Sequence, residues 1–204
     1  MTADREDARL IVSRHAAKLF LERGVAGTSG DDIAEAAGLS KRTVWRYFRS
    51  KEACVEPLFS ASSLRFASVL REWPLQTSIE AYLHEAIRPL DQTPQEIADD
   101  VLAVRLVALL PAEPALRTAW LMSCHVGEEQ LIDVVAQRSR RLPTDFDVRL
   151  CAAAVMAALR VVDEDVSTAA ITESRKFELP DIIDQMAKAI RTASTLPICD
   201  PVGP

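Results

Sequence analysis

Positions 39 to 51 combine basic and aromatic side chains of the kinds that bind phosphate. Five residues in this stretch are basic, none is acidic, and three aromatic residues lie among them: Lys41, Arg42, Arg46, Arg49 and Lys51, with Trp45, Tyr47 and Phe48. Cationic side chains attract phosphate groups, and indole and phenol groups can donate hydrogen bonds to phosphate oxygens. The stretch therefore predicts a surface that binds nucleic acid.

The charge of the whole chain hides this local basic character. The formal net charge is −6, which taken alone would argue against a nucleic-acid partner. Residues 1–51, however, hold ten basic and seven acidic residues, a net charge of +3, so the remaining residues carry −9. This opposition in sign predicts that a surface for binding phosphate lies in the N-terminal quarter of the chain.

Within a helix over 41–48, Arg42 and Arg46 are four residues apart and share one face. A guanidinium group there can contact the O6 and N7 atoms of guanine, or else a phosphate or solvent. Thr43 can offer its methyl group to thymine or its hydroxyl group to a phosphate. Ser29 and Lys41 are expected to bind phosphate as well.

Short helices with clear end signals are expected to position these side chains. Gly24 should end the first helix, and Thr28 or Ser29 can cap a second helix whose first turn is acidic. Gly38 should end that helix, and Ser40 can cap the third. Two helices joined by so short a turn are typical of a helix-turn-helix.

The rest of the chain also has helical periodicity, with few glycines and no Asn-Gly or Asp-Gly turns. We expect an all-α fold of about nine helices, including a long helix over 51–73 in which Pro57 lies in the second turn. The expected division is a DNA-binding domain at 1–50, a C-terminal domain at 51–195, and a flexible tail at 196–204 that contains three prolines.

The N-terminal part resembles the TetR family of bacterial transcriptional repressors. The resemblance rests on the segments AAKLFLERG, TSGDDIAEAAGLS and KRTVWRYFRSKE, which lie between residues 16 and 52. It implies a three-helix DNA-binding domain followed by a larger helical domain that binds a ligand and dimerises. Gly30 departs from the family pattern, which commonly has an apolar or β-branched residue there, and should weaken the second helix slightly.

The resemblance also implies roles for individual residues. Trp45 and Tyr47 lie where the family contacts the sugar-phosphate backbone, and Lys51 lies where its lysine contacts a phosphate. An alternative places Trp45 in the core, because the apolar residues Val44 and Phe48 flank it. Phe48 itself is expected in the core.

The last two expected helices are helix 8, with its core at 151–162, and helix 9, which begins at Pro180. A homodimer through these helices, bound to a near-palindromic site in double-stranded DNA, follows mainly from the resemblance. Small and apolar residues on these helices would form a four-helix interface, although the same residues would also suit an intramolecular core. They are Leu150, Ala152, Ala153, Ala154, Val155, Ala157, Ala158, Val161, Ile183 and Met186.

The family further implies an effector pocket in the C-terminal domain. Candidate ligand-binding residues are Arg105, Trp120, Cys124 and His125. Ordinary packing would explain the last three equally, and Arg105 could instead be a surface residue. Because only 5% of the residues are aromatic, we favour an acyl or other amphipathic anion over a cationic effector.

Other functional classes find little support. The sequence has no GxSxG motif, glycine-rich phosphate loop or paired metal-ligand spacing, so we expect no enzyme activity, cofactor or metal. It has no secretory signal or membrane-spanning run, and its four scattered cysteines suit reduced, mostly buried thiols in the cytoplasm. A pure protein-interaction bundle would not need the basic stretch.

The expected function is a DNA-binding regulator. We interpret the chain as a dimeric repressor that a small molecule releases from its operator. A helix-turn-helix protein that acts without an effector, or one that activates transcription, is the alternative.

Overall fold

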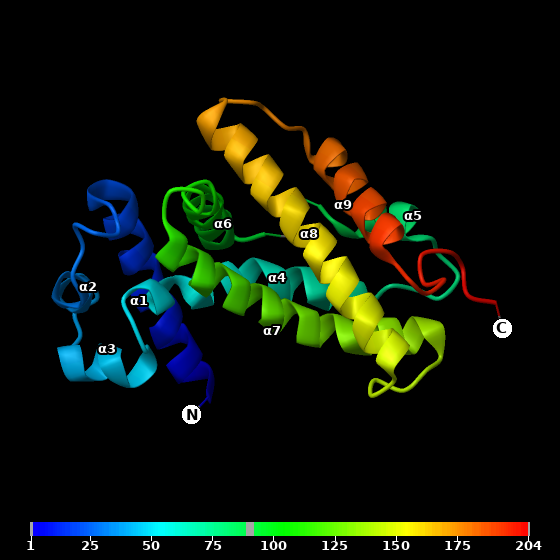
Figure 1. Ribbon diagram of the computed structural model, residues 1–204, viewed down its shortest axis with the longest axis horizontal. Helices are drawn as coiled ribbons and strands as arrows, with labels where there is room; N and C mark the ends of the chain where they lie inside the picture. Colours follow the sequence, from blue (N-terminus) through cyan, green and yellow to red (C-terminus); the bar gives the residue numbers. More distant parts are fainter. Residues whose placement is uncertain (1, 89–91, 204) are drawn as a thin grey trace. The chain divides into compact units, whose positions relative to one another are not determined.

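The computed structural model describes residues 2–88 and 92–203, with side chains from residue 6 onward. The described residues form helices and connections without a β-strand, as predicted (Figure 1). None of these helices is both long enough and apolar enough to cross a membrane. In chain order they are α1 (Thr2–Arg23), α2 (Gly30–Ala36), α3 (Lys41–Tyr47), η1 (Glu52–Val55), α4 (Glu56–Arg71), α5 (Ile79–Ala86), α6 (Pro94–Val107), α7 (Pro114–Ser139), α8 (Phe146–Thr172) and α9 (Leu179–Ala193).

Two glycines end the first two helices in the predicted places. Gly24 follows α1 with φ of 75°, and Gly38 follows α2 with φ of 65°. A side chain would be strained in this left-handed region, whereas glycine adopts it readily. The turn at Gly24 precedes α2, and the turn at Gly38 joins α2 closely to α3.

The helix predicted over 51–73 begins later than expected. Residues Glu52–Val55 form the 3-10 helix η1, and α4 starts at Glu56. Pro57 therefore lies in the first turn of α4, where its missing N–H is not needed, and the prediction that it lies in the second turn is wrong. The next N–H group, that of Leu58, donates a buried hydrogen bond of 3.0 Å to Ser13 Oγ.

The structure divides into two compact units. The first unit is Met1–Ser62 with Pro94–Ser123, and the second is Ser63–Thr93 with Cys124–Pro204. Helices α4 and α7 each contribute residues to both units. The first unit thus extends beyond the boundary expected at residue 50 and includes α6.

In the first unit, α1 contacts α2, η1 and α6. Its core includes Phe20, Ile33 and Val44, all almost fully buried. An ion pair joins α1 to α6: two nitrogens of the Arg14 guanidinium each lie 2.8 Å from a carboxylate oxygen of Asp99. Asp99 is only 3% exposed, so this bidentate pair is largely shielded from solvent.

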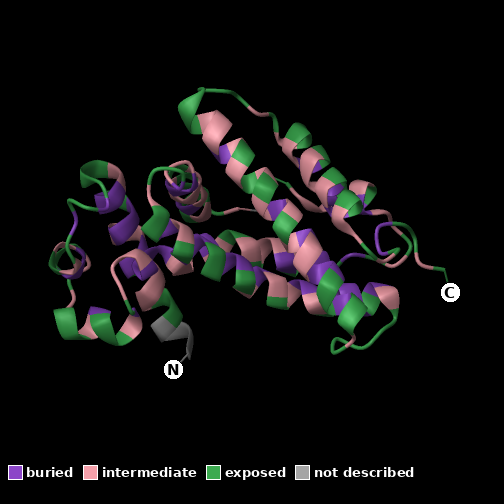
Figure 2. Ribbon diagram, in the orientation of Figure 1, coloured by how far each residue is buried: buried purple, intermediate pink, exposed green. Residues whose placement is uncertain are grey.

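The second unit packs α9 against α5 and α8. Figure 2 shows buried and exposed residues alternating along α8, because one face packs on the core and another faces outward. The core combines apolar residues from five helices: Leu70, Leu83, Leu131, Val134, Val148, Val155, Leu159, Ile183 and Ile190 are among them.

The C-terminal segment, for which a flexible tail at 196–204 was predicted, packs against the rest of its unit. Ile198 and Cys199 are 2% and 4% exposed. The Cys199 carbonyl accepts a hydrogen bond from Ile79 N–H at 2.9 Å, and Val202 N–H donates to Leu75 O at 2.7 Å. Residues 196–203 are thereby attached to the start of α5 and to the loop before it, while residue 204 lies outside the described residues.

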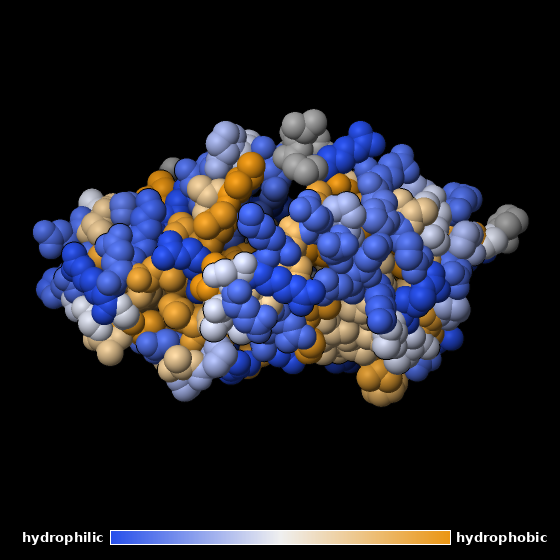
Figure 3. Space-filling model, turned by 90° about the horizontal axis from the view of Figure 1, so that it is seen from above, coloured by the Kyte–Doolittle hydropathy of each residue, from blue (hydrophilic) through white to orange (hydrophobic). Residues whose placement is uncertain are grey.

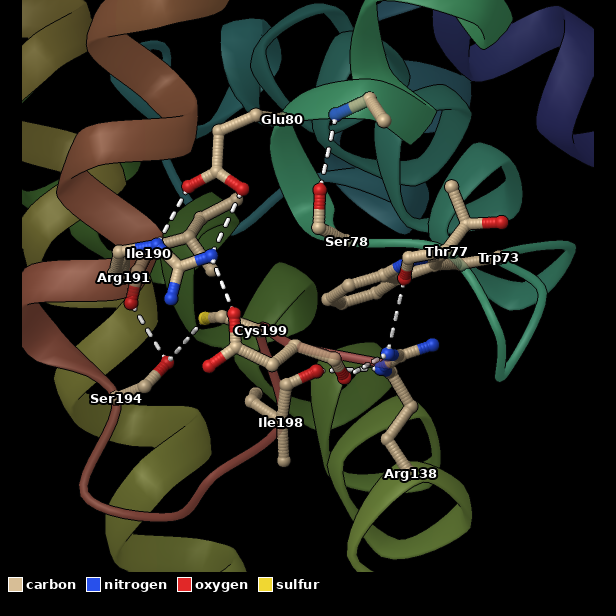
Figure 4. A network of polar contacts seen from close by, with 12 residues as sticks. Trp73, Thr77, Ser78, Glu80, Arg138, Ile190, Arg191, Ser194, Ile198 and Cys199 are labelled. Carbon is tan, nitrogen blue, oxygen red and sulfur yellow. Dashed lines mark hydrogen bonds and ion pairs between the residues drawn. The ribbon is translucent and has the colours of Figure 1, made fainter. Parts of the chain in front are cut away.

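Arg138, on α7, holds this arrangement together (Figure 4). Its guanidinium lies 3.4 Å from the centre of the Trp73 ring, and the residue is 2% exposed. Burial lowers the pKa of Arg138 to about 10, so the group stays charged at neutral pH. It donates hydrogen bonds to four carbonyl oxygens, those of Pro74 (2.9 Å), Thr77 (3.3 Å), Ile198 (2.6 Å) and Asp200 (2.9 Å).

Candidate nucleic-acid interface

A closed capping box fixes the start of α2. The backbone N–H of Asp32 donates to Ser29 Oγ at 3.2 Å, and Asp32 Oδ2 accepts from the backbone N–H of Ser29 at 2.7 Å. Hydrogen bonds that the Asp32 carboxylate accepts from the Ser29 hydroxyl and then from the Ser29 backbone N–H hold the pKa of Asp32 below its usual value. Ser29, expected to bind phosphate, therefore caps α2, and its hydroxyl also donates to the Asp32 carboxylate.

The start and the inner face of α3 are equally well defined. Ser40 Oγ accepts a hydrogen bond of 3.2 Å from Thr43 N–H, and the two hydroxyl oxygens are 2.9 Å apart. Val44 and Phe48 are 0% and 5% exposed. Phe48 is a core residue as predicted, and these two side chains anchor α3 so that its opposite face is exposed.

The outward face of α3 carries Arg42, Trp45 and Arg46, all exposed. Arg42 makes no hydrogen bond or ion pair with any residue that the structure describes. Arg46 donates to the Tyr47 hydroxyl at 3.3 Å and lies 5.1 Å from the centre of its ring. Trp45 is 45% exposed, so the alternative that placed it in the core is wrong.

Gly30 and Trp45 are in close contact, which the sequence did not predict. A Cβ atom placed on Gly30 would lie 2.0 Å from Cζ2 of Trp45 and 2.5 Å from Cη2. The indole ring therefore occupies the space that any larger residue at position 30 would need. Gly30 was expected only to weaken α2, and the spacing of 15 residues gave no signal of the contact.

The two lysines of the basic stretch have partners within the chain. Lys41 forms an ion pair with Asp31 on α2. The ammonium group of Lys51 donates to the backbone carbonyls of Val25 (2.7 Å) and Thr28 (2.8 Å), which lie in the loop between α1 and α2. Lys51 thus holds that loop, with one N–H left for a phosphate.

The four candidate ligand-binding residues fall in different units. Arg105 and Trp120 belong to the first unit, where Arg105 is exposed and Trp120 packs edge-on against Phe59, with ring centres 5.3 Å apart. Cys124 and His125 belong to the second unit. His125 is exposed, with Nε2 3.8 Å from a carboxylate oxygen of Glu129.

The cysteines are free and buried, as expected: Cys54, Cys124, Cys151 and Cys199 form no disulfide. Burial raises the pKa of both Cys54 and Cys124 to about 12. The thiolate is the reactive form, so this shift favours the less reactive protonated thiol at both positions.

Some of the residues expected at the dimer interface are buried within the protein, and others are exposed. Ala152, Val155 and Ile183 are buried in the core of their own unit, so their assignment to the interface was wrong. Leu150 and Val161 are 46% and 49% exposed. Two further exposed apolar residues of α8, Phe146 and Ile171, were not predicted.

Comparison with protein-family models gives two matches that together follow the order of the chain. Residues 14–58 match the bacterial regulatory proteins of the tetR family, and residues 77–195 match the MftR C-terminal domain. The first match contains all of α2 and α3, and the second covers more than half of the chain.

Similar proteins agree with this assignment. The HTH-type transcriptional regulator TcmR of Streptomyces glaucescens is 30% identical over 158 residues, which cover 74% of this chain and 70% of TcmR. The mycofactocin biosynthesis regulator MftR of Mycobacterium tuberculosis is 28% identical over 136 residues, 66% of this chain and 67% of MftR.

Two solved structures share the fold. Salmonella enterica GusR has a TM-score of 0.50 at 22% identity, covering 92% of this chain and 95% of GusR. The reduced form of E. coli NemR has a TM-score of 0.51 at 20% identity, covering 94% and 98% of the two chains. The chain belongs to the TetR family and is a DNA-binding transcriptional regulator.

Proposed function

We propose that the protein is a dimeric repressor that a small molecule releases from a near-palindromic operator. The observation that carries this proposal is the outward face of α3, where Arg42 has no partner among the described residues. A guanidinium group left free on a recognition helix suits bidentate contact with a guanine edge in the major groove. Arg46 and Thr43 would contribute to the same reading face.

The exposed apolar residues of α8 support a two-fold dimer. Phe146 is 74% exposed, and Leu150, Val161 and Ile171 are each nearly half exposed. Their spacing places them within about 80° of one another around the helix. The exposed Ala157 lies on the same face, which lets a second helix approach closely. A symmetric partner would cover this apolar face, and the dimer would carry two α3 helices, one for each half-site.

Release by an effector requires that the ligand bind the DNA-free conformation more tightly than the DNA-bound one. The Arg14–Asp99 ion pair supports a coupling between the effector and the DNA-binding helices within the first unit. A shift of α6 would move α1 through this ion pair, and α1 packs against α2. We retain an amphipathic anion as the effector class. Arg105 on α6, with the exposed Val101 one turn away, supplies the cation and apolar surface.

Capture of sheared genomic DNA tests the DNA-binding part of the proposal. The wild-type protein should enrich fragments that share a near-palindrome, and fragments enriched by Arg42→Ala should lose base preference at one pair of symmetry-related positions. Arg42 is preferable to Lys51 for the variant because Lys51 also holds a loop. If fragments without shared sequence are enriched equally by both proteins, α3 does not read bases as proposed.

Sedimentation velocity tests the dimer. Val161→Glu should convert a dimer into a monomer, because it places a charge in an apolar interface. Arg149→Ala, which alters an exposed residue of the same helix, should leave the dimer intact. A wild-type protein that sediments as a monomer, or a Val161→Glu variant that remains dimeric, would overturn this interface.

The effector class is tested with dodecanoate. It should raise the melting temperature and weaken operator binding, and Arg105→Ala should abolish both effects. Equal responses of the wild-type and variant proteins would exclude Arg105 as the anion-binding group.

A further inference from the structure

The contact between Gly30 and Trp45 joins the start of α2 to the exposed face of α3. The nearest atoms of the indole belong to its six-membered ring, and a Cβ on Gly30 would meet them at 2.0 and 2.5 Å. Real Cβ contacts lie beyond 3.0 Å, so a larger residue would force the ring to move. The indole ring of Trp45 can therefore occupy this position only if residue 30 is glycine.

The surroundings of the two residues leave little room for compensation. The capping box of Ser29 and Asp32 fixes the backbone on either side of Gly30. Val44, buried beside Trp45 in the sequence, fixes the backbone of α3. A side chain at position 30 would consequently displace the indole rather than either helix.

The held indole has the properties of a DNA contact. Trp45 is 45% exposed, and its N–H has no hydrogen-bond partner among the residues that the structure describes. It shares the outward face of α3 with Arg42 and Arg46, at spacings of three residues and one. An indole N–H can donate to a phosphate oxygen, and the ring adds no charge.

We propose that Gly30 is a positioning residue for DNA binding: by lacking a side chain, it lets the Trp45 indole lie on the start of α2, where its N–H meets the DNA backbone. This inference rests on the use of α3 as the DNA-reading helix. It adds that the position of the indole depends on both Gly30 in α2 and Trp45 in α3.

Two simple expectations follow for DNA affinity. Trp45→Ala should weaken binding to all sequences about tenfold, the effect of losing one hydrogen bond to a charged group. Because the indole is uncharged, the dependence of affinity on salt should not change, whereas it would change on loss of a phosphate-binding lysine. Gly30→Ala should weaken binding similarly by moving the ring.

A double-mutant cycle separates this positioning role from a structural one. Gly30→Ala should cost affinity in the wild-type background and have no effect on affinity in the Trp45→Ala background. Alanine is the better helix former, so Gly30→Ala should also raise the melting temperature in the Trp45→Ala background. Ala36→Gly, an opposite change elsewhere in α2, should lower stability without changing the effect of Trp45→Ala.

Iodide quenching of tryptophan fluorescence reports the ring position without DNA. Trp73 and Trp120 are 3% and 4% exposed, so iodide should quench Trp45 selectively. Trp45→Phe should remove the quenchable component, and Gly30→Ala should make it more accessible. This readout does not depend on DNA. If α3 does not bind DNA, Arg42→Ala will leave DNA binding unchanged, whereas unchanged affinity in Trp45→Ala alone would overturn the present proposal.

The proposal is overturned if Gly30→Ala leaves both quenching and affinity unchanged. It is also overturned if Gly30→Ala weakens binding equally in the wild-type and Trp45→Ala backgrounds, because the effect would not then pass through the indole. Circular dichroism of each variant confirms that the comparison is made between folded proteins.

Discussion

Two arginines show how differently the two units use the same side chain. Arg42, in the first unit, is exposed and has no partner among the described residues. Arg138, in the second unit, is 2% exposed, lies on the Trp73 ring, and donates to four backbone carbonyls. The hydrogen-bond partners of each guanidinium group depend on its surroundings. Arg42 lies on the outer face of a short helix, whereas Arg138 faces an irregular segment that offers backbone carbonyls.

The comparison indicates which residues serve structure and which serve binding. A buried guanidinium group that satisfies several carbonyls stabilises the fold, and its loss leaves buried acceptors unpaired. An exposed guanidinium group on a fixed helix contributes little to stability and remains available to a ligand. In the space-filling view most of the visible face is hydrophilic, so exposure alone does not distinguish a binding residue (Figure 3).

The largest expected effect is on the stability of the fold and concerns Arg138. Arg138→Met should lower the free energy of unfolding by about 3–5 kcal/mol, because it removes a buried charge that pairs with four carbonyls. Urea unfolding followed by circular dichroism measures this change. The exposed Arg149→Met is the matched control, with an expected change within about 0.5 kcal/mol.

If Arg138→Met were as stable as the control, the network in Figure 4 would contribute nothing to the fold. Base preference of the Arg138→Met protein, measured below its melting temperature, should match that of the wild type.

Lys51 is expected to combine the structural role of Arg138 with the DNA-binding role of Arg42. Lys51→Met should lower the free energy of unfolding by about 1–2 kcal/mol, because the carbonyls of Val25 and Thr28 lose a charged donor. It should also weaken binding to all DNA sequences and reduce the salt slope by about one. Unfolding and salt-dependent affinity are both measured, with Lys188→Met on α9 as the control.

A change in DNA affinity without a change in stability would contradict the structural role of Lys51. A change in stability alone would remove Lys51 from the DNA interface.

The smallest effect is expected at the exposed ion pair of Glu80 and Arg191. Arg191 lies 2.6 and 2.8 Å from the two carboxylate oxygens and lowers the pKa of Glu80 to about 2. The folded state therefore favours the ionised carboxylate, so this stabilisation is present above the unfolded pKa of 4.5 and is lost as the pH falls toward 2.

Glu80→Gln should accordingly lower stability by less than about 1 kcal/mol near pH 7, since the pair is exposed. The difference from the wild type should persist at about pH 5 and shrink at about pH 3.5, as measured by urea unfolding. Glu85→Gln, on the same helix, is the control. A difference that grows as the pH falls would reverse the sign of the proposed contribution.

Local signals predicted most of the helical architecture. Gly24 and Gly38 end helices because their left-handed conformation is a property of the residue, and Ser40 caps α3 for a similarly local reason. The burial of Val44 and Phe48 follows from their spacing of four on α3. These features needed no knowledge of distant parts of the chain.

Long-range contacts account for the errors. The packing of the C-terminal segment involves a hydrogen bond from Arg138, which is 60 residues from Ile198 in the sequence. Proline content alone indicated flexibility there. The contact of Gly30 with Trp45 and the carbonyl contacts of Lys51 likewise require the relative placement of separate helices.

Selection from a randomised DNA library most directly tests the central claim that α3 reads bases in a symmetric dimer. The wild-type protein should select a near-palindrome, and Arg42→Ala should lose base preference at one pair of symmetry-related positions, worth about 1–3 kcal/mol at each. An unchanged sequence preference in Arg42→Ala, or a loss at a single unpaired position, would contradict this account.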